Sequence, residues 1–272
     1  KNDGSAANEQ TNVYALDQCT SAPNVLYCGT EPGEVYKSTD SAATWSCVSL
    51  NQDFGGGVSA IEVNPMNANI VFAGSGSGVK RSLDGGLTWT SVLNANNLYV
   101  NEILISPANT QIVLVAADLG LYRSTNGGTS FTQLFAHKSF DLKVKPGSGN
   151  TIYLVKDNPT LQICQFFKST DGGATWTVQS SGWFSSTDPA RHDGGARIGV
   201  SPADTNRVYA YLIGEAKAND YGFIGVYRSN DGGQTWTLPN APAGGPYTAT
   251  HPNLAYGYSG WTYHQGFYNC GL

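Results

Sequence analysis

This 272-residue chain has few charges, one methionine and no long apolar run. Only 13% of its residues are charged, and 15 Lys and Arg against 20 Asp and Glu give a net charge of −5. Nucleic-acid binding depends on cations that neutralise phosphates, so the absence of a basic cluster excludes nucleic acid as an expected partner. No segment approaches the ~20 apolar residues of a membrane span. Abundant Gly, Ser, Thr and Asn are typical of extracellular β-proteins, and we predict a secreted or cell-envelope location.

The chain also lacks any cysteine pattern typical of a metal site. It has five cysteines and no CxxC pair, and their spacing suits no zinc site, so we predict no metal and no other cofactor. Two alternatives remain for them: a disulfide within residues 13–50, where three of them lie, or five small buried hydrophobic side chains. The cysteines are Cys19, Cys28, Cys47, Cys164 and Cys270.

The main feature that the sequence does contain is a nine-residue motif, called the box below, that occurs five times. Each copy has a basic residue, Ser, any residue, Asp or Asn, usually Gly-Gly, then Thr or Ser and an aromatic residue. The copies occupy residues 37–45, 81–89, 123–131, 168–176 and 228–236. Their Asp or Asn positions lie 44, 42, 45 and 60 residues apart. A recurrence of roughly 40–50 residues built from short β runs is typical of a propeller with one blade per repeat.

The remainder of each repeat predicts four short strands, A to D, with the box at the C–D hairpin and a Pro turn before strand B. We therefore predict an all-β fold, a β-propeller of four-stranded antiparallel blades that forms a single domain over residues 1–272. Its five visible blades cover about residues 13–50, 56–93, 98–135, 139–180 and 195–240. Residues 241–272 would form a long loop and the first strand of a further blade, or a closing strand.

The box residues have structural rather than catalytic roles in this interpretation. The Asp or Asn oxygen can accept backbone N–H groups within the turn, and glycine supplies the positive φ that a tight turn needs. The aromatic residue would bury apolar area between neighbouring blades. The residues in these two structural positions are Asp40, Asp84, Asn126, Asp171 and Asp231, and Trp45, Trp89, Phe131, Trp176 and Trp236.

The five copies resemble the Asp-box (BNR) repeats of sialidases, sortilin-type receptors, xyloglucanase-like glycoside hydrolases and many secreted bacterial proteins. The resemblance covers about residues 13–240. Two copies depart from the pattern: Ala42 replaces a glycine in the first box, and Asn126 and Phe131 replace Asp and Trp in the third. We expect both to form variant hairpins of the same kind.

The ends of the chain leave two possibilities. The segment Tyr268-Asn269-Cys270-Gly271-Leu272 either closes the first blade or begins a sixth one. Because an open propeller leaves unpaired sheet edges, closure or further blades would be needed. The stretch Gln265-Gly266-Phe267-Tyr268 is similar to stretches that precede further blades in secreted bacterial proteins. We favour a fragment of a longer protein, trimmed or processed before Lys1, whose partners include further blades or domains.

Strand direction places the long loops at one end of the blades, where B–C and D–A connections meet. Residues 180–195, 213–222 and 245–268 bring aromatic side chains and three of the four histidines to this end. Long loops on a rigid scaffold are common binding sites. Our candidate ligand-binding residues there are Trp183, Arg191, His192, Tyr221, Tyr258, Trp261, Tyr263 and His264.

The same end carries the candidate catalytic carboxylates Glu31, Asp118, Asp193 and Glu215. Glycoside hydrolysis needs two carboxyl groups about 5–10 Å apart, one of them protonated. Xyloglucanase-like hydrolases place an acid in a similar B–C loop, which Glu31 and Asp118 match in form. Sialidases carry Arg-Ile-Pro, and Arg197-Ile198-Gly199 lacks the proline. No Ser/His/Asp constellation is evident.

Two classes of function follow. The favoured one is a secreted, non-catalytic propeller module that binds glycan or peptide through the loop end, as part of a larger extracellular protein. The alternative is a glycoside hydrolase acting on a polysaccharide. A third option, a fragment of a sortilin-like receptor, would bind a peptide inside the propeller channel.

Overall fold

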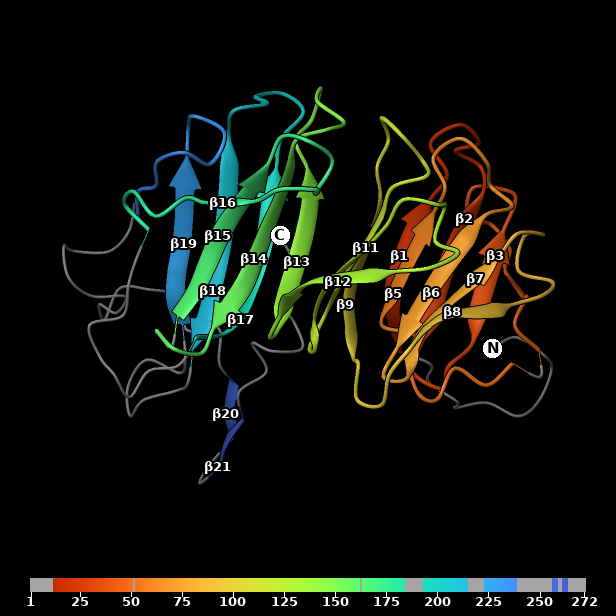
Figure 1. Cartoon of the computed structure of the whole chain (residues 1–272). Helices are drawn as coiled ribbons and strands as arrows, with labels where there is room; N and C mark the ends of the chain where they lie inside the picture. The colour runs from red at the N-terminus through yellow and green to blue at the C-terminus, as the bar shows by residue number, and fades with distance from the viewer. Residues whose placement is uncertain are drawn as a thin grey trace. The chain divides into compact units, whose positions relative to one another are not determined.

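The computed structural model describes residues 12–50, 52–161, 163–183, 193–214, 223–238, 256–258 and 261–263. By contacts, the chain divides into two compact units, Lys1–Ala136 and His137–Leu272. Every regular element in the described residues is a β-strand, as the sequence predicted (Figure 1). The elements are described below for each unit by itself.

Unit 1 consists of three four-stranded antiparallel sheets whose strands follow chain order, which we call blades 1 to 3. In each blade the second strand is buried along most of its length, while the fourth is largely exposed. Strand B of blade 2, for example, is buried at all five positions, and strand D at none. The strands are β1 (Val13–Gln18), β2 (Leu26–Thr30), β3 (Val35–Ser38), β4 (Ser46–Cys47), β5 (Ala60–Val63), β6 (Val71–Ser75), β7 (Gly78–Ser82), β8 (Thr90–Asn94), β9 (Val100–Ile105), β10 (Val113–Ala117), β11 (Gly120–Ser124) and β12 (Thr132–Ala136).

Unit 2 contains one four-stranded sheet (blade 4), one three-stranded sheet (blade 5) and a short hairpin. Within the described residues, which end at Leu238 here, the fourth strand of blade 5 is represented by a single bridge between Arg228 and Thr237. The hairpin lies in the range 241–272, which we predicted to be a long loop and a strand; the predicted strand, residues 268–272, lies outside the described residues. The strands are β13 (Ser139–Val144), β14 (Ile152–Asn158), β15 (Ile163–Ser169), β16 (Thr177–Val178), β17 (Asp193–Val200), β18 (Val208–Gly214), β19 (Phe223–Ser229), β20 (Tyr256–Tyr258) and β21 (Trp261–Tyr263).

Each unit is held together by apolar side chains between successive blades. In unit 1 one cluster joins blades 1 and 2 around Tyr27 and Val71, and a second joins blades 2 and 3 around Phe72 and Val113. In unit 2 a cluster around Phe166 joins blades 4 and 5. The aromatic box residues contribute unequally: only Trp236 is fully buried, at 3% exposure, and the other four are half-buried.

The serine of each box, to which the sequence analysis gave no role, organises the turn. In blade 2 the Ser82 Oγ donates to Asp84 Oδ1 (2.8 Å) and accepts the N–H of Gly86 (2.8 Å). Asp84 then accepts the N–H and the hydroxyl of Thr88, at 2.9 and 2.6 Å. The carboxylate therefore closes the turn four residues on, not two as an Asx turn would. The serine bonds recur in all five boxes, as does acceptance of the N–H four residues on.

The second glycine of the box has a further role between blades. A Cβ on Gly86 would lie 2.6 Å from Val48 of blade 1, and one on Gly233 would lie 2.7 Å from Phe166 of blade 4. A Cβ on Gly128 would overlap the Phe72 ring of blade 2. Ala42 takes this position in the first box at φ 69°, and it is exposed. Glycine here thus serves close packing as well as positive φ.

The basic residue at the start of the box also links blades. Arg81 Nη1 donates to the carbonyl of Gly127 in the next blade at 2.6 Å. Lys168 Nζ donates likewise to the Gly232 carbonyl at 3.0 Å, and Lys37 Nζ reaches the Gly85 carbonyl at 3.5 Å. The box therefore combines a local turn with a contact to its neighbour.

For four of the five cysteines, the structure decides between a disulfide and a free, buried side chain. Cys19, Cys28, Cys47 and Cys164 form no disulfide. The first, second and fourth of these are buried, as small hydrophobic side chains would be, and Cys47 is half-buried. Cys270 lies outside the described residues.

Candidate functional site

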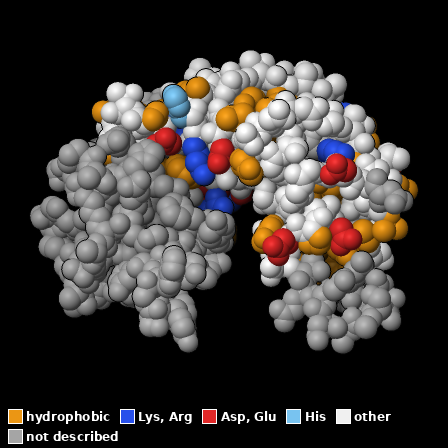
Figure 2. All heavy atoms as spheres, turned by 90° about the horizontal axis from the view of Figure 1, so that it is seen from below, with side chains coloured by type: hydrophobic (Ala, Val, Ile, Leu, Met, Phe, Trp, Pro, Cys, Tyr) orange, Lys and Arg blue, Asp and Glu red, His pale blue; other side chains and the backbone are white. Residues whose placement is uncertain are grey.

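Strands A begin, and strands B end, at the same end of every blade. For unit 1 this is the lower end in Figure 1, and Figure 2 shows acidic side chains beside hydrophobic ones on the described surface of that unit. Among the described residues, unit 1 supplies the most complete part of this end, because blades 1 to 3 are described almost without gaps.

An acid directly follows strand B in blades 1 and 3, as Glu31 and Asp118, and Asp157 of β14 takes the corresponding position in blade 4. Glu31, Asp118 and Asp157 each donate their backbone N–H to a carbonyl just before strand A of their own blade, namely that of Asn12 (2.9 Å), Leu98 (3.0 Å) or Lys138 (2.7 Å). Two of the predicted catalytic candidates, Glu31 and Asp118, therefore occupy one repeated position. Blade 2 has Gly76 there.

At blade 1, Glu31 lies beside the exposed Tyr14. The Glu31 carboxylate accepts the Asn12 amide at 2.5 Å. A Cβ on Gly57 would lie 2.9 Å from the Glu31 carbonyl and 3.1 Å from the Tyr14 ring, so this loop from blade 1 to blade 2 passes directly against both residues. Tyr14 is 53% exposed.

At blades 2 and 3 the same loop meets a second exposed tyrosine. Gly55 touches Ser77, and its carbonyl accepts the Ser77 hydroxyl at 3.3 Å. Gly76, next to Ser77, lies against Tyr99, which is 55% exposed. The Tyr99 carbonyl accepts the Asp118 N–H at 3.1 Å, and Asn101 donates to the Asp118 carboxylate at 2.8 Å.

These contacts form one continuous surface, which we call the unit 1 rim. It has an exposed tyrosine and a carboxylate at each end and glycine-rich loops between them. Its members are Tyr14, Glu31, Gly55, Gly57, Gly76, Ser77, Tyr99 and Asp118.

Charge distinguishes the two units. Residues 1–136 contain five Lys and Arg and eleven Asp and Glu, a net charge of −6. Residues 137–272 contain ten and nine, a net charge of +1. The unit 1 rim is thus part of an acidic unit, which disfavours anionic ligands.

Trp183, predicted to bind ligand, lies in the core of unit 2. It is 9% exposed, and its indole N–H donates to the Cys164 carbonyl at 2.8 Å. Its ring stacks on Tyr227 at 5.0 Å and meets Trp236 edge-on at 4.9 Å. Because core aromatic rings cover Trp183, it offers no open face for a sugar, and the prediction for this residue was wrong.

The other candidates in unit 2 have no described side-chain geometry. Asp193 is the first residue of β17, and Tyr258 is the last residue of β20. Trp261 and Tyr263 are the first and last residues of β21. For all four, only the backbone is described. Arg191, His192, Glu215, Tyr221 and His264 lie outside the described residues. Their predicted roles stay predictions.

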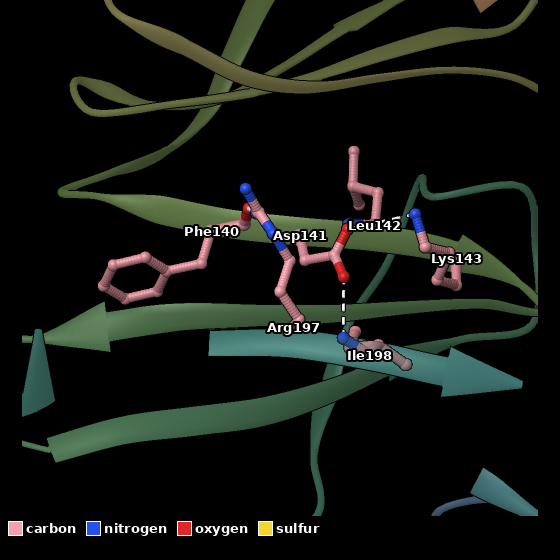
Figure 3. Close-up of polar contacts among 6 residues, drawn as sticks. All are labelled: Phe140, Asp141, Leu142, Lys143, Arg197 and Ile198. Carbon is pink, nitrogen blue, oxygen red and sulfur yellow. Dashed lines mark hydrogen bonds and ion pairs between the residues drawn. The ribbon is translucent and has the colours of Figure 1, made fainter. Parts of the chain in front are cut away.

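Asp141 on β13 is a fully buried carboxylate that sequence reasoning missed. Its Oδ2 accepts the N–H of Ile198 on β17 at 2.6 Å, and its Oδ1 accepts the Leu142 N–H at 2.9 Å and lies 3.2 Å from Lys143 Nζ (Figure 3). Arg197 donates to the Phe140 carbonyl at 2.6 Å. Donors surround the carboxylate, so it links two blades and is not offered to a substrate.

The box carboxylates are similarly occupied. Hydrogen bonds from the Thr44 hydroxyl and N–H lower the pKa of Asp40 to about 2, and those from Thr88 do the same for Asp84. Burial opposes the shift at Asp171 and Asp231, yet hydrogen bonds still bring each pKa to about 2. A general acid needs a raised pKa, so these groups are unsuited to that role.

Two further features are absent from the described ranges. No group of three or more His, Cys, Asp or Glu side chains there is arranged to hold a metal ion. The same part of the chain contains no helix long and apolar enough to cross a membrane.

Comparison with known proteins identifies the fold. No family model and no curated protein matches the chain. Among solved structures, a GH74 enzyme from Niastella koreensis matches with a TM-score of 0.65 and 24% identity, over 83% of this chain and 38% of that one. A GH74 xyloglucanase from Xanthomonas campestris matches with a TM-score of 0.66 and 17% identity, with the same coverage.

YCF48, in a structure with D1 peptide, matches with a TM-score of 0.55 and 15% identity, over 87% of this chain and 70% of that one. This chain spans less than half the length of the two GH74 proteins. Together with the repeated antiparallel sheets, these likenesses confirm the all-β, β-propeller fold class.

Proposed function

We propose that this chain is an extracellular β-propeller module that binds a polysaccharide at the unit 1 rim, as part of a larger protein. The observation that carries the proposal is the convergence on one surface of exposed tyrosines and carboxylates from blades 1 and 3, with glycine-rich loops beside blade 2 between them. Tyrosine rings offer apolar faces to sugar rings, while carboxylates and amides accept or donate hydrogen bonds to hydroxyl groups. The likeness to a GH74 xyloglucanase supports a carbohydrate ligand.

Glycoside hydrolysis is the second candidate, favoured by the likeness to GH74 enzymes and by Glu31 and Asp118 at a shared position. Those two acids belong to blades 1 and 3, so a whole blade lies between them. Packed sheets are roughly 10 Å apart, whereas a hydrolytic pair needs a separation of about 5–10 Å. This spacing favours binding over hydrolysis for these residues.

The test measures retardation and reducing-end release with the same purified chain and polysaccharide panel. Binding without hydrolysis predicts retardation in an affinity gel and no release of reducing ends. Release that disappears in Glu31→Gln or Asp118→Asn would replace our proposal by the hydrolase. If the chain shows no retardation and releases no reducing ends, both the binding module and the hydrolase are contradicted. A peptide ligand would then be the remaining candidate.

A further inference from the structure

Tyr99 and Gly76 pack against each other at the unit 1 rim. Blade 2 has glycine at the repeated position that Glu31, Asp118 and Asp157 occupy in blades 1, 3 and 4. A Cβ on Gly76 would lie 3.2 and 3.4 Å from two carbons of the Tyr99 ring. The ring therefore rests where a side chain of residue 76 would otherwise begin.

The backbone of Tyr99 is also held in an unfavourable conformation. Its φ of 43° lies in the left-handed region, which costs a residue with a Cβ roughly 1–2 kcal/mol. Hydrogen bonds on both sides fix it there: its N–H donates to the Gly76 carbonyl at 3.3 Å, and its carbonyl accepts the Asp118 N–H at 3.1 Å.

Folding gains little from this arrangement, because Tyr99 remains 55% exposed. Strained residues persist where surrounding contacts impose them, and they are frequent at ligand sites. An aromatic ring held in place before binding loses little side-chain entropy when a ligand stacks on it. The contacts of Tyr99 therefore hold its aromatic ring in a fixed position while leaving it exposed.

We propose that Tyr99 is the stacking platform for one sugar ring of a neutral polysaccharide and that Gly76 is a positioning residue for it. The inference rests on the proposed function and adds the residue and the ligand class. Neutral sugars fit because unit 1 carries a net charge of −6 and the rim carboxylates Glu31 and Asp118 would repel uronic acids. Asp118 and Asn101, bonded to each other at 2.8 Å, lie next to the platform as partners for hydroxyl groups.

The deciding variant is Tyr99→Asn, studied in the full chain by affinity electrophoresis. Asparagine accepts a left-handed backbone better than most residues, so the variant should fold at least as stably as the parent chain. Loss of the ring should raise the apparent Kd for neutral polysaccharides about threefold to tenfold, the effect of one aromatic contact. Tyr99→Phe keeps the ring and should bind as the parent does.

Gly76→Ala tests the positioning role, with urea unfolding as its readout of folding. The methyl group should displace the Tyr99 ring and raise Kd while the unfolding midpoint stays close to that of the parent. Leu119→Ala, at a 40% exposed residue of the same end, is the control and should leave Kd unchanged.

Each result has a defined meaning. Unchanged binding by Tyr99→Asn would overturn the platform while leaving the proposed function intact, and unchanged binding by Gly76→Ala would overturn the positioning role. Preference for alginate or polygalacturonate over neutral polymers would overturn the ligand class. Failure of the parent chain to bind any polysaccharide would overturn the proposed function itself.

Discussion

The carboxylate of Asp141 on β13 accepts the backbone N–H of Ile198 on β17, 2.6 Å away, and so joins strand A of one blade to strand A of the next. Unit 1 contains the same kind of link twice. Asp17 accepts the N–H of Val63 at 2.7 Å, and Glu62 accepts that of Ile105 at 2.8 Å. Adjacent strands A are too far apart for a sheet ladder, so side-chain carboxylates satisfy these backbone donors instead.

Removal of the Asp141 carboxylate should destabilise unit 2. Asp141→Ala leaves the buried N–H groups of Leu142 and Ile198 without their acceptor, and we expect a loss of about 2–3 kcal/mol in the free energy of unfolding. Urea unfolding measures it. Asp204→Ala, which breaks an exposed ion pair with Arg207, should cost less than about 1 kcal/mol. Equal losses in the two variants would contradict the role given to Asp141.

Arg81 should contribute to stability through its contact with the next blade. Its guanidinium donates to the Gly127 carbonyl at 2.6 Å and to the Thr129 hydroxyl at 3.1 Å. Because the side chain is half-buried, Arg81→Met should lower the free energy of unfolding by about 1–2 kcal/mol. Arg81→Lys retains one donor and should lose less. A methionine variant as stable as the parent would show that the contact adds nothing.

The two glycines of the third box provide a matched pair. Both have left-handed backbones, Gly127 at φ 67° and Gly128 at φ 74°, so an alanine meets similar backbone strain at either site, roughly 1–2 kcal/mol. A Cβ on Gly127 faces only the flexible Gln111 side chain, whereas one on Gly128 overlaps the Phe72 ring.

Gly128→Ala should therefore lose about 1–3 kcal/mol more than Gly127→Ala in denaturant unfolding, the usual cost of overpacking a well-filled interior. If the two variants lose the same amount, the second glycine is required only for its backbone. Phe72→Leu combined with Gly128→Ala should recover part of the difference, since the smaller side chain makes room for the methyl group.

The box carboxylates should make stability depend on acid pH. Hydrogen bonds from Thr88 lower the pKa of Asp84 to about 2 in the folded chain, whereas an unfolded Asp has a pKa near about 3.9. Because the folded value is the lower one, the stabilisation is complete above about pH 5 and is lost as pH falls towards 2. The native Asn126 shows that the box tolerates an amide.

Asp84→Asn should accordingly be somewhat less stable than the parent at pH 7, and the difference should shrink on acidification to about pH 2.5. Chemical unfolding at both pH values measures it. A difference that stays constant with pH would mean that the charge of Asp84 does not contribute.

Much of the box could be predicted because its contacts are local. The positive φ of Gly85 and Gly86, 78° and 96°, follows from a turn that spans only a few residues. The part that sequence reasoning missed, the link from Arg81 to Gly127, joins residues 46 positions apart. The prediction that Trp183 binds ligand failed for a related reason. Its neighbours in sequence suggested an exposed loop, whereas its burial depends on the distant residues Phe166, Tyr227 and Trp236.

The sequence by itself determined the all-β class, the five repeats and the position of each box turn, because a short periodic pattern and local hydrogen bonds specify them. Only the tertiary structure decided which residues share a surface. Tyr14, Gly57, Gly76 and Tyr99 come from separate strands and loops, and the packing of three blades brings them together. Glu31 and Asp118 were the sequence signals of that surface, whereas the meaning of Gly76 required the position of the Tyr99 ring.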